Sequence, residues 1–68
     1  MSYTAKNLIR AAKKKGYQVK EGGKHSLVFD PVSGRRISTI PRGFIPKGTF
    51  NAILKQMNLT EEEFKKLL

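Results

Sequence analysis

The residues best suited to chemistry in this chain are a single histidine and the cations near it. His25 is the only histidine among 68 residues, and it directly follows Gly22-Gly23-Lys24. Histidine, with an unperturbed pKa of about 6.5, both takes up and releases protons near neutral pH. The formal net charge of +9 favours a polyanion as partner. Together these features predict chemistry on a nucleic acid, although a lone histidine taken by itself is more often structural.

The composition narrows the class of protein further. The chain has no cysteine, and Glu21 and Asp30 are the only acidic residues ahead of the C-terminal segment. We therefore expect no disulfide, no metal site and no cofactor. No apolar run approaches the roughly 18 residues of a membrane span, which predicts a cytoplasmic protein without membrane contact. Because 68 residues build only a small core, we expect one domain, 1–68, whose stability leans on a partner.

Apolar residues at helical spacing predict two long helices that flank the region of His25. The first, over 4–15, is expected to begin at Thr4 as N-cap and to end at Gly16. The second, over 46–57, is expected to have Pro46 at its first position, where a missing N–H costs nothing. The apolar positions at i, i+3, i+4 and i+7 are Ala5, Leu8, Ile9 and Ala12 in the first helix and Phe50, Ile53, Leu54 and Met57 in the second.

The residues between the two helices predict three strands, over 17–20, 24–29 and 35–40. Short turns join consecutive strands, so the expected arrangement is an antiparallel meander. Pro41 is expected to end the third strand, and 42–45 to form a connecting loop.

The C-terminal segment carries its own helix signal. Thr60 and Glu63 have the spacing of a capping box, which predicts a short third helix after Asn58. The expected fold class is therefore α+β, in the order α-β-β-β-α with a short extra C-terminal helix. Helices on one face of a three-stranded antiparallel sheet bury these apolar stripes with the fewest elements.

The second strand leaves open which face carries the histidine. Alternation places His25, Leu27 and Phe29 on one face. If that face is the core, the histidine is structural. If the helices cover Val28 instead, the first face is an open apolar surface beside the histidine, suited to docking a partner.

Two motifs in this framework resemble a known family. The motifs are Gly-Lys-His at the start of the second strand and Pro-Lys-Gly-Thr at the start of the last long helix. With the flanking residues 23–31, 34–36 and 45–56, they resemble the HicA family of mRNA-cleaving toxins over nearly the whole chain. The resemblance implies a fold similar to double-stranded-RNA-binding domains. It also implies a metal-independent, histidine-dependent endoribonuclease of the mRNA interferase type, and a HicB-type antitoxin as partner.

By this resemblance His25 matches the catalytic histidine of the family, and Gly23 matches the glycine before it. Lys24 stands where the family often has Ser, and Ser26 stands where a second His is common. The resemblance favours His25 on the open face of the sheet. It is also compatible with a homodimer or a larger toxin–antitoxin assembly.

RNA carries its own nucleophile, the 2′-OH, so its cleavage needs proton transfer and stabilisation of an anionic phosphate. His25 is the expected general base or acid. The expected phosphate-binding cations are Lys24, Lys20, Arg35, Arg36 and Lys47. The second proton carrier stays open among water, Lys24, Tyr17, Ser26 and the His25 of another copy.

Two functions without catalysis fit the same residues. One is an RNA-binding module of the same fold, in which the histidine and cations grip phosphate and 2′-OH groups. The other is a small structural subunit of a ribonucleoprotein or phage complex, whose charge neutralises nucleic acid.

Overall fold

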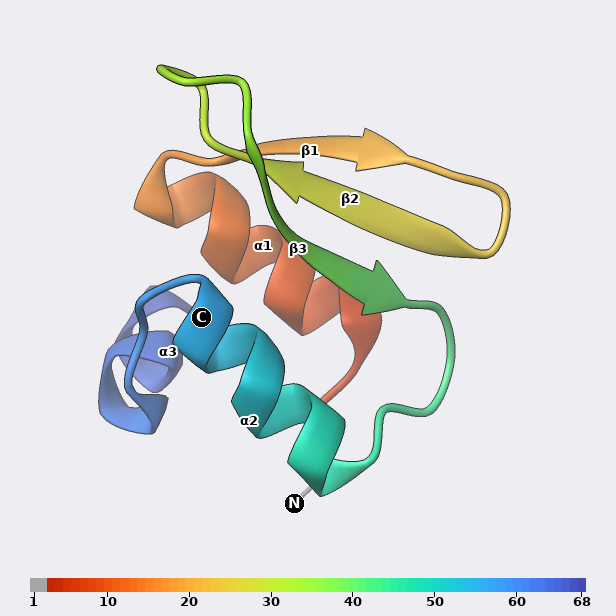
Figure 1. The fold of residues 1–68 in the computed structure, drawn as a ribbon. Helices are drawn as coiled ribbons and strands as arrows, with labels where there is room; N and C mark the ends of the chain where they lie inside the picture. The colour runs from red at the N-terminus through yellow and green to blue at the C-terminus, as the bar shows by residue number, and fades with distance from the viewer. Residues whose placement is uncertain (1–2) are drawn as a thin grey trace.

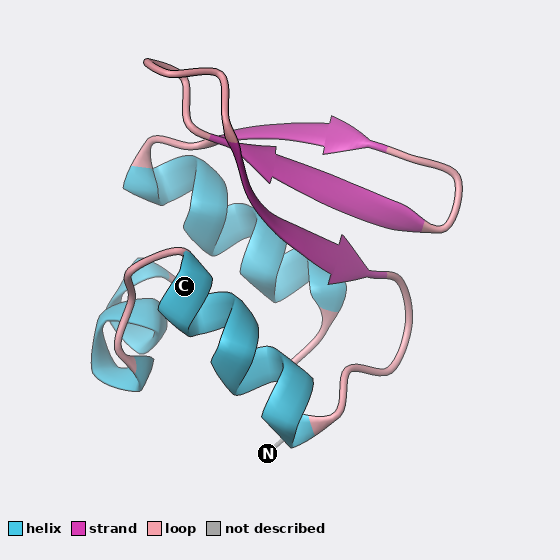
Figure 2. Ribbon diagram, in the orientation of Figure 1, coloured by secondary structure: helices cyan, strands magenta, loops and turns pink. Residues whose placement is uncertain are grey.

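A computed structural model describes residues 3–68 as a three-stranded sheet with three helices (Figure 1). The elements are α1 (Ala5–Lys15), β1 (Gln18–Glu21), β2 (His25–Phe29), β3 (Arg36–Pro41), α2 (Lys47–Gln56) and α3 (Glu61–Leu67). Figure 2 shows all three helices on one side of the sheet. The expected α+β class and element order are confirmed. No helix within residues 3–68 has the length and hydropathy needed to cross a membrane.

The sheet is an antiparallel meander in the order β1-β2-β3, with β2 at its centre. Val28 lies opposite Val19 on one side and Ser38 on the other. His25, the first residue of β2, is the Cα partner of Pro41. The third strand therefore includes Pro41 as its last residue. It ends one residue later than the expected end at residue 40. An edge strand tolerates a proline there because its outer N–H positions have no strand to bond.

The first helix begins and ends at the expected residues. Asn7 N–H donates to the Thr4 hydroxyl, and Thr4 N–H donates to the Asn7 side-chain oxygen at 3.0 Å, which forms a capping box. Gly16 ends the helix with φ of 102°, a left-handed conformation that glycine adopts without a steric penalty. These two signals fix the length of α1.

The second helix begins one residue later than expected. Pro46 is its N-cap, with an extended ψ of 150°, and its carbonyl accepts the Phe50 N–H at 2.9 Å. Asn58, with φ of 57°, follows the end of the helix in the left-handed region. No side chain caps the start of α2.

The third helix has the expected capping box. Glu63 N–H donates to the Thr60 hydroxyl and Thr60 N–H donates to the Glu63 carboxylate, both at 3.1 Å. The hydrogen bonds from the Thr60 backbone, and secondarily from its side chain, lower the pKa of Glu63 from its ordinary value of 4.5.

The core lies between the helices and one face of the sheet. Val28 and Ile40 from the sheet are fully buried beneath the helix layer, in which α3 packs on α1 and α2. The other buried apolar residues are Leu8, Ala11, Ala12, Ile45, Phe50, Ile53, Leu54, Met57, Leu59 and Phe64. The helices therefore cover the face of β2 that carries Val28, and the opposite face is open.

Candidate functional site

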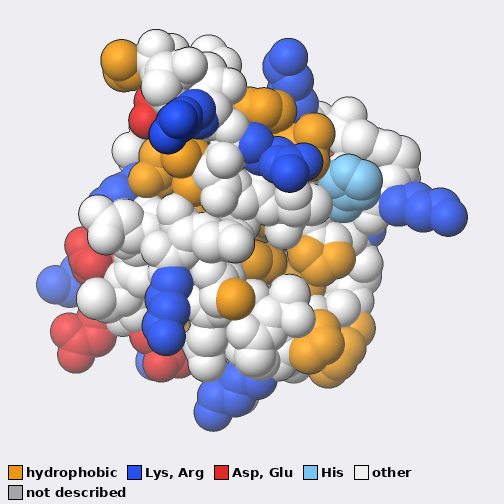
Figure 3. All heavy atoms as spheres, viewed as in Figure 1, with side chains coloured by type: hydrophobic (Ala, Val, Ile, Leu, Met, Phe, Trp, Pro, Cys, Tyr) orange, Lys and Arg blue, Asp and Glu red, His pale blue; other side chains and the backbone are white. Residues whose placement is uncertain are grey.

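His25 lies on the open face at the beginning of the central strand. Ser26 and Val28, its alternating neighbours, are 1% and 0% exposed because they point into the helix layer. His25 itself is exposed, and Leu27 and Phe29 share its face and are partly buried. Figure 3 shows the pale-blue histidine at the surface with Lys and Arg side chains nearby. The structure thus places His25 outside the core.

The turn before His25 is fixed by a close backbone contact. Gly22 N–H donates to the His25 carbonyl at 2.8 Å. A Cβ on Gly22 would lie 2.7 Å from that carbonyl oxygen, whereas a Cβ on Gly23 would meet nothing within 4 Å. The glycine that this geometry requires is therefore Gly22, because only a residue without Cβ can approach so closely.

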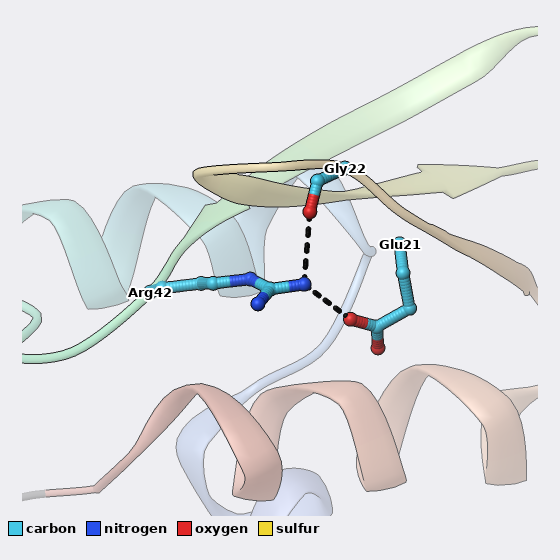
Figure 4. A network of polar contacts seen from close by, with 3 residues as sticks. All are labelled: Glu21, Gly22 and Arg42. Atoms are coloured by element: carbon cyan, nitrogen blue, oxygen red, sulfur yellow. Dashed lines mark hydrogen bonds and ion pairs between the residues drawn. The ribbon is translucent and has the colours of Figure 1, made fainter.

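Arg42 ties the same turn to the end of β3. Its Nη2 donates to the Gly22 carbonyl at 2.8 Å and forms an ion pair with Glu21 at 2.7 Å (Figure 4). The Arg42 backbone N–H donates to the Lys24 carbonyl at 3.4 Å. The segment that carries His25 is thus held through its backbone from both neighbouring strands.

Two of the five expected phosphate-binding cations lie in this turn or in the strand before it. Lys24 is exposed and directly precedes His25. Lys20 lies opposite Leu27 in β1, on the same face as His25. However, the Lys20 ammonium is 5.5 Å from the centroid of the Phe29 ring, toward the far end of the strand. Lys24 is therefore the closer of the two to His25.

The other three expected cations lie elsewhere. Arg35 is in the loop between β2 and β3, and Arg36 pairs with Phe29 at the far end of β2. Four residue steps separate Phe29 from His25, which is about 13 Å along a strand. Lys47 is the first residue of α2, in the helix layer. The structure does not bring these three cations together with His25.

Two of the expected second proton carriers lie where they do not face His25. Tyr17 precedes β1 at the Phe29 end of the sheet, and its hydroxyl donates to the Met57 carbonyl at 3.1 Å. Ser26 is buried on the opposite face. Within residues 3–68, no group of three or more His, Asp, Glu or Cys residues is arranged to hold a metal ion.

Sequence reasoning placed Gly22 only in a turn and Arg42 only in a connecting loop, and it assigned neither residue to the site. Their contacts join residues about twenty positions apart, which composition does not reveal. The predicted strand order could nevertheless have indicated Arg42, because an antiparallel meander brings the residues after the third strand beside the start of the second.

The comparisons with known proteins bear on this site. A family model described as HicA toxin of bacterial toxin-antitoxin matches residues 5–59. The chain belongs to the HicA toxin family. No match was found among curated proteins.

The match extends over most of this HicA toxin. It includes the histidine, the turn before it and all five expected cations, and it ends before α3. The family assigns the protein to a toxin–antitoxin pair as the toxin.

Proposed function

We propose that this HicA toxin is a metal-independent endoribonuclease that cleaves mRNA, with His25 as its general base or acid. The observation that carries the proposal is an exposed histidine whose backbone is held from two strands, beside Lys24, on the open face of a basic protein. A structural histidine is normally bonded within the fold, whereas His25 faces solvent where a large substrate has access.

The reaction that these groups support is attack by the substrate's own 2′-OH. The 2′ oxygen forms a bond to phosphorus as its proton is removed, and the bond to the 5′ oxygen breaks as that oxygen gains a proton. The products are a 2′,3′-cyclic phosphate and a free 5′-OH. His25 performs one of the two proton transfers, and Lys24 stabilises the charge on the phosphate.

The other proton transfer requires a second carrier. With Tyr17 and Ser26 removed by their positions, the candidates are Lys24, water and the His25 of a second copy. A second copy in the reactive complex makes the cleavage rate per chain rise with toxin concentration. If the toxin is a monomer in solution, a rate per chain that is independent of concentration assigns the role to Lys24 or water.

The antitoxin that completes the pair is proposed to be of the HicB type. The uncovered face of the sheet offers it partly exposed apolar side chains, Leu27 and Phe29, beside His25. A protein bound there would close access to the histidine.

The decisive experiment compares RNA cleavage by the wild type and by His25→Ala in the presence of EDTA. Proton transfer by a positioned side chain contributes roughly 10²- to 10⁴-fold, so the variant should lose that much rate. The products of the wild type should carry 2′,3′-cyclic phosphate and 5′-OH ends. RNA affinity, measured in parallel, should stay within a few-fold.

Gln18→Ala is a matched control, because this exposed residue lies on β1 opposite Phe29, at the far end of the sheet. It should cleave at the wild-type rate. Equal cleavage by His25→Ala and the wild type would remove His25 from the mechanism. RNA binding without cleavage by either protein would instead favour the non-catalytic RNA-binding module.

A further inference from the structure

A hollow of about 440 Å³ lies where the loop after β3 meets the start of α2. Its volume falls within the range of small-ligand pockets, roughly 300–1,000 Å³. Six side chains give it its chemistry: Tyr3, Phe44, Lys47, Phe50, Asn51 and Glu61. None of them takes part in the catalytic proposal; Lys47, one of the expected phosphate-binding cations, lies apart from His25 in the helix layer.

An exposed aromatic ring lines the hollow. Phe44 is 80% exposed, whereas most large apolar side chains of the described residues are buried. Behind it the aromatic rings are held rigidly, since Tyr3 stacks on Phe50 with centroids 5.3 Å apart and both meet Phe64 edge to face. The core is therefore complete without Phe44, and this ring is free to stack on a ligand.

The polar groups of the hollow suit a nucleotide. Asn51 supplies an amide donor and acceptor, and Glu61 supplies acceptors for the amino groups of bases. Lys47 supplies a cation at the first position of a helix that no side chain caps. The Phe44 ring can stack on a base, Asn51 and Glu61 can bond the edge of that base, and Lys47 can bind the adjoining phosphate.

The hollow lies within reach of an RNA bound at His25. Phe44 follows Pro41 by three residues, and Pro41 is the Cα partner of His25. Three extended residues plus one strand spacing give at most about 16 Å between the Cα atoms of Phe44 and His25. A few nucleotides of single-stranded RNA span that distance.

We propose that this hollow binds one unpaired base of the RNA, stacked on Phe44, with the adjoining phosphate at Lys47. This inference rests on the proposed ribonuclease function and specifies its substrate as RNA with an unpaired nucleotide close to the cleaved bond. An apolar protein segment fits less well, because two charged side chains and an amide line the hollow and the net charge of +9 favours RNA.

The test is a binding experiment in the His25→Ala protein, which leaves the RNA intact. The ligands are a single-stranded RNA oligomer and a series in which each nucleotide in turn is abasic. Loss of one stacked base weakens binding roughly 5- to 150-fold, so Phe44→Ala should raise the Kd of the intact RNA by such a factor. One abasic position should cause a similar loss, and the two losses should not add.

Matched variants make the result specific to the ring. Phe44→Tyr should retain affinity because it keeps the ring. Val32→Ala, at the other most exposed apolar residue of the described chain, 94% exposed, should have no effect. Circular dichroism melting of Phe44→Ala should match the wild type.

The outcomes separate this inference from the catalytic proposal. If Phe44→Ala binds intact RNA like the wild type, or if its loss adds to that of every abasic position, the inference is overturned while histidine-dependent cleavage stands. If Phe44→Ala weakens antitoxin binding but not RNA binding, the hollow is a protein site and the inference is again overturned. Coupling between Phe44 and one base, together with no RNA cleavage by the wild type, supports the base-binding site and overturns the catalytic proposal alone.

Discussion

The turns at the two ends of the sheet are held in different ways: the turn between β1 and β2 spans residues 22–24, and the loop between β2 and β3 spans residues 30–35. At the His25 end, contacts from outside the turn fix it: Arg42 bonds the Gly22 carbonyl and Glu21. At the far end, the loop from Asp30 to Arg35 is held by its own residues. Asp30 accepts the Val32 and Ser33 N–H groups through its carboxylate, and its backbone carbonyl accepts the Gly34 N–H.

This difference shows that positive charge is present at both ends of the sheet, whereas a histidine on a fixed backbone is present only at one. Arg35 and Arg36 give the far end as much charge as the near end, yet both are exposed and the loop between the strands reaches no other element through its side-chain hydrogen bonds within the described residues. At the near end, by contrast, the turn before His25 is held by the Gly22 N–H bond to the His25 carbonyl and by Arg42, which follows β3. We therefore expect the near end to govern rate and both ends to share in affinity.

Among changes that leave His25 in place, the largest effect should come from Gly22→Ala. Its Cβ would lie 2.7 Å from the His25 carbonyl oxygen, so the backbone of the turn must shift. A misplacement of about 1 Å costs on the order of 10²-fold in rate, and kcat should fall by about that factor with KM little changed. Gly23→Ala is the control, with open space around the new Cβ. A larger loss for Gly23→Ala than for Gly22→Ala would contradict this geometry.

Arg42→Ala should have an intermediate effect. It removes the ion pair with Glu21 and the bond to the Gly22 carbonyl, but the Gly22 N–H bond to His25 remains. We expect kcat to fall about tenfold. Because the ion pair is exposed, the free energy of unfolding should change by less than about 1 kcal/mol.

Arg35→Ala is the control for Arg42→Ala, since it removes the same charge from the far end. It should leave kcat unchanged at saturating RNA. If both variants lose kcat equally, general charge rather than positioning governs the rate, and the contrast between the two ends fails.

A smaller effect is expected on the salt dependence of RNA binding. Each phosphate contact contributes about 0.7 to the slope of log K against log salt for single strands. Lys24→Gln should reduce the slope by about that amount, measured from 50 to 200 mM salt. Arg35→Gln should reduce it as well if the RNA extends along the sheet. An unchanged slope for Lys24→Gln would remove this lysine from the RNA interface.

The smallest effect concerns α3, remote from both turns. The pKa of Glu63 is lowered in the folded protein, so its stabilising effect is complete above the ordinary value of 4.5 and is lost as the pH falls through the folded value. Glu63→Gln should therefore lose less stability on acidification than the wild type, measured by thermal melting from pH 7 to 3. Cleavage at neutral pH should not change. A change there would show that α3 acts on the site.

Local signals made most of the fold predictable. Thr4, Gly16 and Thr60 act within their own helix ends, and the structure has each helix where these residues indicated. Pro46 and Pro41 were each misplaced by one residue. A proline, which has no N–H, fits the N-cap of a helix as well as its first helical position, so the pattern did not separate the two for Pro46. A proline likewise fits the last residue of an edge strand as well as the residue after it, so the end of the third strand at Pro41 was open by one residue.

The site was less predictable because it depends on contacts between distant segments. Alternation in β2 defined two faces but not which one the helices cover, and the burial of Ser26 and Val28 decides this. The resemblance to HicA toxins indicated the open face for His25. Arg42 looked like an ordinary loop cation until the sheet register placed it beside Gly22.

The contact between Gly22 and His25 has a genetic consequence. Most inactivating changes in a small protein act by unfolding it, and cells then degrade the product. Gly22 lies in a turn and is not one of the core residues, so we expect its replacement to shift the backbone at His25 while the apolar residues stay packed. Among cells that survive expression of this toxin, we therefore expect some clones with a substitution at codon 22. In those clones the full-length protein should still accumulate, and it should still bind the antitoxin.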